Sequence, residues 1–196
     1  MPYAPDHKDR TRARIVESAR VLFNRHGFDA VSIDEVMKGA GLTRGGFYHH
    51  FSSKESLYAA AVSSFISCNP FNERAERSPR KRTPRQRAEL LVDTYLSDEV
   101  LADVDKHCPL IALPSDVARA GLQPRAAYTR LVKGMLHIFR GAFPKSDRQA
   151  FRKAQLIVNL CVGGMLIART TDDPTLRTQL RAAARSEALR LLAGGE

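Results

Sequence analysis

Apolar residues recur at helical spacing along most of this chain. Between residues 10 and 25, Ile15, Ala19, Leu22 and Phe23 lie at offsets of 0, 4, 7 and 8, which places them on one face of a helix. No segment shows sustained alternation of apolar and polar residues with β-branched enrichment. The pattern therefore predicts an all-α fold without a sheet, and we expect about nine helices.

The first 67 residues are expected to form four helices with short connections. Gly27 ends the first helix. Ser32 and Glu35 form an S-x-x-E capping box, with Val31 and Val36 placed as its hydrophobic staple. A second, short helix is therefore predicted to begin after Ser32.

The third and fourth helices follow a glycine-bearing turn. Gly39 and Gly41 supply the permissive backbone for a sharp turn. Thr43 is the expected N-cap of the third helix, over residues 43–50. The fourth helix is predicted to begin at Ser52, with a second capping box closed by Glu55.

The rest of the chain is also predicted to be helical. Residues 69–84 are rich in Pro, Arg and Glu and predict a linker or a loosely ordered loop. Pro124 and Pro174 suit the first turns of helices, and Asp173 suits an N-cap. Amphipathic segments are expected at roughly 85–103, 109–119, 124–142, 147–170 and 174–192.

Two short helices joined by a glycine-bearing turn are typical of a helix-turn-helix, whose second helix enters the major groove of DNA. At 100° per residue, Phe47 faces inward, whereas Tyr48 and His49 face outward with Arg44 at the N-terminal end. Gly45 lies on the outer face and lets the backbone approach DNA closely.

Each of these side chains also has a plain structural interpretation. Arg44 contacts a guanine edge or a phosphate, or is a solvated arginine. Tyr48 and His49 contact phosphate or a thymine methyl group, or are a half-buried aromatic and a surface histidine. Lys54, in the first turn of the fourth helix, is a candidate phosphate ligand. The predicted DNA contacts are Ser32, Thr43, Arg44, Gly45, Tyr48, His49 and Lys54.

Charge supports an anionic partner. The 196 residues include 31 Lys and Arg against 21 Asp and Glu, a net charge of +10, and 43% are apolar, which excludes a disordered chain. Residues 8–25 and 73–87 together carry most of this excess. The first segment precedes the third helix and is expected to lie across phosphates. The second is either a further phosphate contact or a solvated loop.

Cys68, Cys108 and Cys161 lack the paired spacing of a disulfide framework or a metal site. We expect a reducing compartment, no metal and no cofactor. The first residues carry no apolar signal segment, and the longest apolar run, 154–168, is shorter than the roughly 20 residues needed to span a bilayer. A cytoplasmic protein without a membrane partner is therefore expected.

Enzyme motifs are missing from the sequence. It has no G-x-S-x-G, H-E-x-x-H or P-loop, and the glycine-rich stretch at 39–46 follows a predicted helix rather than a strand. A non-enzyme is expected. A non-specific basic nucleic-acid binder remains the alternative to a sequence-selective one.

The N-terminal motifs resemble one family closely. F-x-x-x-G-F at 23–28, S-I-D-E-V at 32–36, A-G-L-T-R-G-G-F-Y-H-H-F at 40–51 and S-K-E-S-L at 53–57 are similar to the DNA-binding domain of TetR-family transcriptional regulators. This match covers about a quarter of the chain. The remainder is similar more loosely to one branch of that family through H-C-P-L at 107–110, residues 115–119, G-G-M-L-I-A-R at 163–169, Asp173 and Pro174. His107 stands where that branch usually has glycine.

The resemblance implies a helix-turn-helix domain at 1–67, whose three helices are linked by a fourth to an effector-binding and dimerisation domain at 68–196. It implies a homodimer that binds a palindromic operator and represses until a small ligand enters the C-terminal domain; an activator is the alternative. The last two helices, about 149–170 and 174–192, would form the dimer interface. The nearly all-apolar segment 154–168, with Gly163 and Gly164 for close helix approach, fits this, or fits the core helix of a monomer.

The effector site is less clearly marked. Candidate lining residues are Tyr95, Cys108, Tyr128, Met135, Phe139 and Asn159, each of which also suits ordinary core or surface. If Pro109 begins a helix, the Cys108 thiol lies at its N-terminus beside Lys106 and His107, which predicts a lowered pKa. A repressor that senses oxidants or electrophiles through Cys108 is therefore an alternative function. The other interpretation of Cys108 is a buried, inert thiol.

Overall fold

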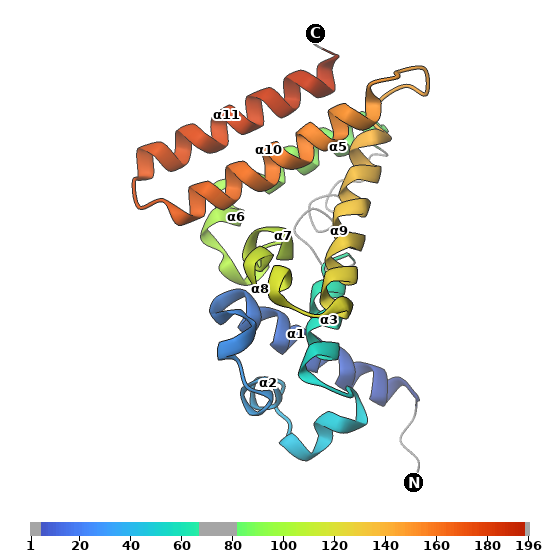
Figure 1. Ribbon diagram of the computed structural model, residues 1–196, viewed down its shortest axis with the longest axis vertical. Helices are drawn as coiled ribbons and strands as arrows, with labels where there is room; N and C mark the ends of the chain where they lie inside the picture. The colour runs from blue at the N-terminus through green and yellow to red at the C-terminus, as the bar shows by residue number, and fades with distance from the viewer. Residues whose placement is uncertain (1–4, 67–81, 195–196) are drawn as a thin grey trace.

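The computed structural model describes residues 5–66 and 82–194, and every regular element within these ranges is a helix (Figure 1). The all-α prediction is confirmed. The predicted boundary between the two domains, most of the predicted linker at 69–84 and Cys68 lie outside the described residues.

The N-terminal domain has four helical elements around one apolar core. The first helix carries Ile15, Ala19 and Phe23 fully buried, as the spacing predicts, and Leu22 packs partly buried against them. Tyr58 meets Phe23 edge to face with ring centroids 5.0 Å apart. In chain order the elements are α1 (Pro5–Ala30), α2 (Ile33–Gly39), the 3-10 helix η1 (Arg44–His49) and α3 (Lys54–Ser64).

The predicted start of α2 is confirmed. Ser32 Oγ accepts a hydrogen bond from the Glu35 backbone N–H at 3.2 Å, and the Glu35 carboxylate accepts one from the Ser32 N–H at 2.7 Å. The hydrogen bonds that the Glu35 carboxylate accepts from the Ser32 N–H and from the Ser32 hydroxyl lower the pKa of Glu35. Val31 and Val36, the predicted staple, are both buried.

Gly27 ends the first stretch of regular helix, as predicted: it has a positive φ of 78° and a non-helical backbone, and α1 continues beyond this kink to Ala30. One other helix end differs from the prediction. The cap of α3 is Ser53 with Ser56 as its partner, not Ser52 with Glu55. Phe51 is buried and its N–H donates to the Phe47 carbonyl, so the chain is still leaving the previous turn at Ser52.

The C-terminal domain begins with several short helices and ends with three long ones. The predicted segment 85–103 is divided at Ser97, which caps a new helix, and 109–119 is divided at Pro114, which has no N–H to continue the first helix. The helices are α5 (Pro84–Tyr95), α6 (Asp98–Ala102), the 3-10 helix η2 (Val104–Lys106), α7 (Pro109–Ala112), α8 (Pro114–Arg119), α9 (Leu122–Arg140), α10 (Ala150–Thr170) and α11 (Pro174–Ala193).

Predicted features of the long helices agree with the structure. Pro124 lies in the first turn of α9 and Pro174 is the first residue of α11. Asp173 caps α11, because its Oδ1 accepts hydrogen bonds from the N–H groups of Thr175 and Leu176 at 2.8 and 3.1 Å.

Helices α10 and α11 lie side by side at the end of the molecule opposite α2 (Figure 1). A Cβ atom at Gly164 would lie 2.6 Å from the Ala184 Cβ, so a residue without a side chain is required at this contact, as predicted. A Cβ at Gly163 would meet open space instead. By length and composition alone, α10 is long and apolar enough to cross a membrane. This is weak evidence, because core helices of soluble proteins have the same length and composition.

Candidate DNA-binding surface and effector cavity

The third helical element is held in place by one buried ring. Phe47 is fully buried and packs against Phe51, with ring centroids 5.9 Å apart, and against the edge of Tyr48 at 5.1 Å. The helix lies where the sequence predicts, but it is a 3-10 helix of six residues rather than an α-helix. Adjacent Gly45 and Gly46 explain this, because glycine is a poor α-helix former.

Six of the seven predicted DNA contacts are exposed; Lys54 is half-buried. Tyr48 stands out, with 63% of its surface exposed although it is aromatic. Thr43 occupies the N-cap position but makes no capping bond. The Ser32 hydroxyl is instead bound to Glu35.

Arg44 joins η1 to α2. Its guanidinium contacts the Asp34 carboxylate at 2.8 Å, and both side chains are more than half exposed. An exposed pair of this kind is worth about 1 kcal/mol or less, so Arg44 can exchange Asp34 for another acceptor at small cost.

Lys54 lies in the first turn of α3, as predicted, but its side chain turns toward the end of α1. The ammonium lies 4.4 Å from the centre of the Phe28 ring and donates to the Asp29 carbonyl at 3.4 Å. Burial lowers its pKa. A phosphate contact by Lys54 would therefore require the side chain to leave Phe28.

The N-terminal end of α1 adds cations that the predicted site leaves out. Burial, followed by the charges of Lys8, His49 and Arg12, lowers the pKa of His50. The Arg12 guanidinium also lies 4.6 Å over the Phe51 ring. This part of the basic segment 8–25 therefore lies beside the end of η1, and the charge of that segment was its only sequence signal.

The C-terminal half of the same basic segment has a different place, which corrects the expectation that the whole segment faces phosphate. Arg20 is buried and donates to the Asp105 carbonyl. Arg25 contacts both oxygens of the Asp105 carboxylate at 2.6 Å. Asn24, between them, donates to the His107 carbonyl at 3.0 Å. These three residues of α1 thus hold the segment around η2 of the C-terminal domain, and we call this set of contacts the clamp.

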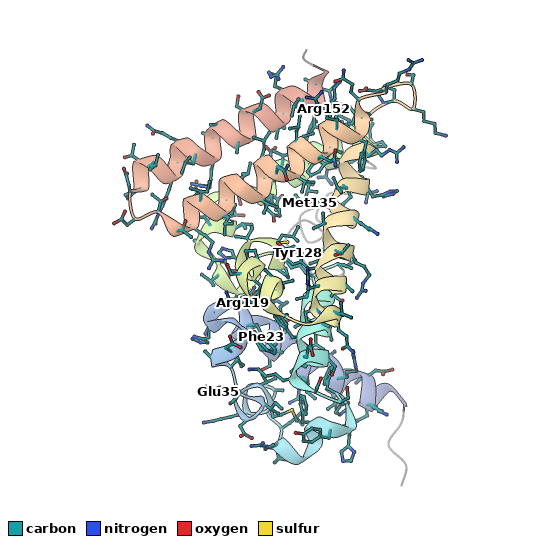
Figure 2. The ribbon with its side chains drawn as sticks, viewed as in Figure 1. Phe23, Glu35, Arg119, Tyr128, Met135 and Arg152 are labelled. Carbon is teal, nitrogen blue, oxygen red and sulfur yellow. The ribbon has the colours of Figure 1, made fainter. Side chains whose placement is uncertain are left out.

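An apolar cavity of about 180 Å³ lies in the C-terminal domain, between α5, α9, the end of α3 and the segment from η2 to α7. Three predicted effector residues, Tyr95, Cys108 and Met135, line it. Met135 points from α9 toward the interior (Figure 2).

The other three predicted effector residues lie elsewhere. Tyr128 donates its hydroxyl to the Leu110 carbonyl at 3.3 Å and is not part of the cavity wall. Phe139 is fully buried in the core, and Asn159 is exposed on α10. Lining residues that the prediction missed include Leu91, Thr94, Arg130, Leu131 and Ile138. Leu91, Leu131 and Ile138 lie three or four residues from Tyr95 or Met135 on the same helix. This helical spacing was the signal in the sequence that could have identified them.

Cys108 occupies the predicted position directly before Pro109, but the predicted lowering of its pKa is wrong. Burial raises the pKa of the thiol to about 12. The helix that follows has only four residues, the Lys106 ammonium pairs with Asp103 at 3.5 Å, and burial lowers the pKa of His107 so that it is neutral. The physical support for an electrophile-sensing thiolate is thereby removed.

Comparison with known proteins assigns the N-terminal domain. Residues 15–61 match the model of the tetR family of bacterial regulatory proteins. The Tn10 TetC protein of Escherichia coli is 50% identical over 50 residues, which cover 26% of this chain and 25% of that protein. The transcriptional repressor AcnR of Corynebacterium glutamicum is 35% identical over 57 residues, which cover 29% of this chain and 30% of AcnR. The matches thus span less than a third of these relatives.

Solved structures extend the likeness in fold to the whole chain. A TetR-family regulator from Cytophaga hutchinsonii has a TM-score of 0.75 over 97% of this chain and 96% of its own, at 20% identity. The regulator FadR of Bacillus subtilis, in complex with stearoyl-CoA, has a TM-score of 0.68 over 94% of this chain and 99% of its own, at 18% identity. Residues 15–61 therefore match the tetR family of bacterial regulatory proteins, and the fold of the whole chain is similar to that of solved TetR-family regulators.

Proposed function

We propose that the protein is a cytoplasmic transcriptional repressor that binds a palindromic DNA operator as a homodimer and releases it when a small molecule enters the C-terminal domain. The observation that carries this proposal is η1: a short exposed helix bearing Arg44, Tyr48 and His49, fixed to the core through fully buried Phe47. AcnR, a repressor by name, supports the direction of regulation.

The DNA contacts divide into two kinds. Arg44, Gly45, Tyr48 and His49 on η1 would face the major groove and read bases, with Thr43 at its start. Ser32, Lys54 and the neighbouring cations Lys8 and Arg12 would contact phosphate, which adds affinity without selectivity. Together these residues would form a small surface at one end of the molecule. This fits one recognition element per protomer.

The exposed side of α10 supports the dimer. Phe151, Leu156 and Ile167 are 50%, 42% and 53% exposed, and Leu176 at the start of α11 is 41% exposed. Leu156 and Ile167 share one face of α10 at 100° per residue, and exposed apolar side chains of this size favour burial against a second copy. The interface would comprise residues 149–170 and 174–192.

Replacement of Arg44 with alanine tests the recognition role. If Arg44 reads a base, we expect a loss of about 1–3 kcal/mol in operator binding and relaxed preference at one position of each half-site. Quantitative gel shifts with operator variants at fixed salt measure both. The matched control is Arg140→Ala, which removes the same charge from the exposed C-terminal end of α9. An equal loss on every sequence would assign Arg44 to phosphate.

The clamp between α1 and η2 supports a route from ligand to DNA. Lys106 and Cys108 line the cavity, and Asp105 between α1 and this wall is held by Arg20 and Arg25. A ligand that displaces the wall would therefore displace α1, against which α2 packs. This gives the two sites one shared element, which an allosteric effect requires.

Asp105→Ala tests this route without knowledge of the ligand. Because the clamp orients α1, we expect operator affinity to fall by about three- to tenfold although Asp105 is remote from η1. Fluorescence anisotropy with labelled operator measures the change. Asp93→Ala is the control: it also removes the partner of an arginine on another helix, Arg185, but that pair joins α5 to α11 and not to α1. The variant keeps the backbone carbonyls that Arg20 and Asn24 bind, so unchanged affinity would rule out a mechanical role for the Arg25–Asp105 pair.

A further inference from the structure

The polar groups in the described lining of the cavity are few, and the charged ones are both cations. Its described lining is mostly apolar, with Thr94, Tyr95 and Cys108 inside and the cations Lys106 and Arg130. Asp and Glu are absent from this described lining. The walls therefore suit a mainly apolar molecule, and the charges attract an anion.

Tyr95 carries a hydrogen-bond donor that no oxygen or nitrogen of the described residues accepts; the thiol of Cys108, a weak acceptor, lies beside it. The residue is 6% exposed, and its hydroxyl has no hydrogen-bond partner among the described residues. Burial raises its pKa well above the usual value, so the hydroxyl keeps its proton. A buried hydroxyl without a partner is costly, and a ligand oxygen in the cavity would satisfy it.

Arg130 supplies the stronger of the two cations. Its guanidinium donates to the Ser63 hydroxyl at 3.2 Å, a neutral partner that leaves its charge uncompensated by that contact. Lys106 already has Asp103 at 3.5 Å. Because a guanidinium presents paired N–H groups that match a carboxylate, Arg130 is the better anchor for an acid.

The size of the cavity limits the ligand further. About 180 Å³ is below the roughly 300–1,000 Å³ of pockets that bind drug-sized molecules. A bulky or multiply charged molecule would not fit among these apolar walls. Arg130 is the one cation of the described lining that has no carboxylate partner among the described residues, which suits a single negative charge.

We propose that the effector is a small, mainly apolar monocarboxylate whose carboxylate binds Arg130 and to which Tyr95 donates a hydrogen bond. This inference rests on the proposed function, because it names the chemical class of the effector at that cavity. It makes Arg130 the residue that selects acids and Tyr95 a residue that adds affinity.

The test uses the full-length protein and three probes of equal chain length: octanoate, octanol and octylamine. Calorimetric titration is expected to show octanoate binding at least about tenfold more tightly than octanol, and octylamine more weakly than both. Arg130→Gln should abolish the preference for the acid. The control Arg125→Gln removes a charge from the same helix outside the cavity wall and should keep it.

Tyr95→Phe separates a binding role from a structural one. Removing a hydroxyl that has no partner should leave the melting temperature equal or higher, yet octanoate should bind about three- to tenfold more weakly. A variant that melts lower and binds octanoate normally would assign the hydroxyl to the fold and remove Tyr95 from the proposal.

Operator binding by the same samples separates this inference from the proposed function. Equal affinity for octanoate and octanol, or no octanoate binding by the wild type, would overturn the monocarboxylate class even if the ligand-free protein binds DNA selectively. Octanoate binding by a protein without selective DNA binding would instead retain the ligand class and overturn the repressor.

Discussion

Replacing Phe47 with alanine is expected to abolish operator binding and to destabilise the N-terminal domain by about 3–5 kcal/mol. The ring is fully buried between Phe51 and Tyr48, so its removal leaves a cavity at the base of η1. Chemical denaturation followed by circular dichroism measures the free energy of unfolding, and a gel shift measures DNA binding.

Tyr48→Ala is the matched control on the same helix. Tyr48 is 63% exposed, so its loss should change the free energy of unfolding by only about 0.5 kcal/mol while still weakening DNA binding. If both variants lose stability equally, or if Phe47→Ala still binds operator, η1 is not anchored in the way described.

The second large effect is expected at the exposed face of α10. A double change, Leu156→Glu with Ile167→Glu, places two carboxylates where the proposed dimer buries apolar side chains. We expect a monomer by analytical ultracentrifugation. Operator affinity should fall at least about a hundredfold, because the two half-sites are then bound independently.

Leu122→Glu provides the comparison for this change. Leu122 is 84% exposed at the start of α9, away from α10 and α11, so the variant should remain a dimer with normal operator affinity. A double variant of α10 that stays dimeric would place the interface elsewhere.

Much of the N-terminal domain follows from local sequence rules. The buried face of α1 and the Ser32 capping box were predicted because each depends on residues within a turn or two of one another. The start of α3 was predicted one residue early, because two serine patterns overlap and only the buried Phe51 decides between them. Similarly, the sequence pattern did not distinguish a 3-10 helix from an α-helix at Gly45 and Gly46.

Features that join distant segments were not predictable from the sequence. Arg20 and Arg25 contact Asp105, which lies some 80 residues further along the chain. Their charge alone therefore did not indicate that they face η2 instead of DNA. The pKa of Cys108 was not predictable for the same reason. Its position before Pro109 was predicted correctly, but burial by other helices raises the pKa of the thiol. Arg130 likewise becomes a candidate ligand only when α9 packs beside Tyr95.

The most direct test of the central claim is a footprint of the full-length protein on the DNA beside its own gene. The account predicts two protected half-sites related by two-fold symmetry, with centres about 34–36 Å apart or a multiple of that distance. It also predicts much weaker binding to random DNA at the same salt concentration. Protection without symmetry, or equal affinity for random DNA, would contradict a dimeric operator-binding repressor.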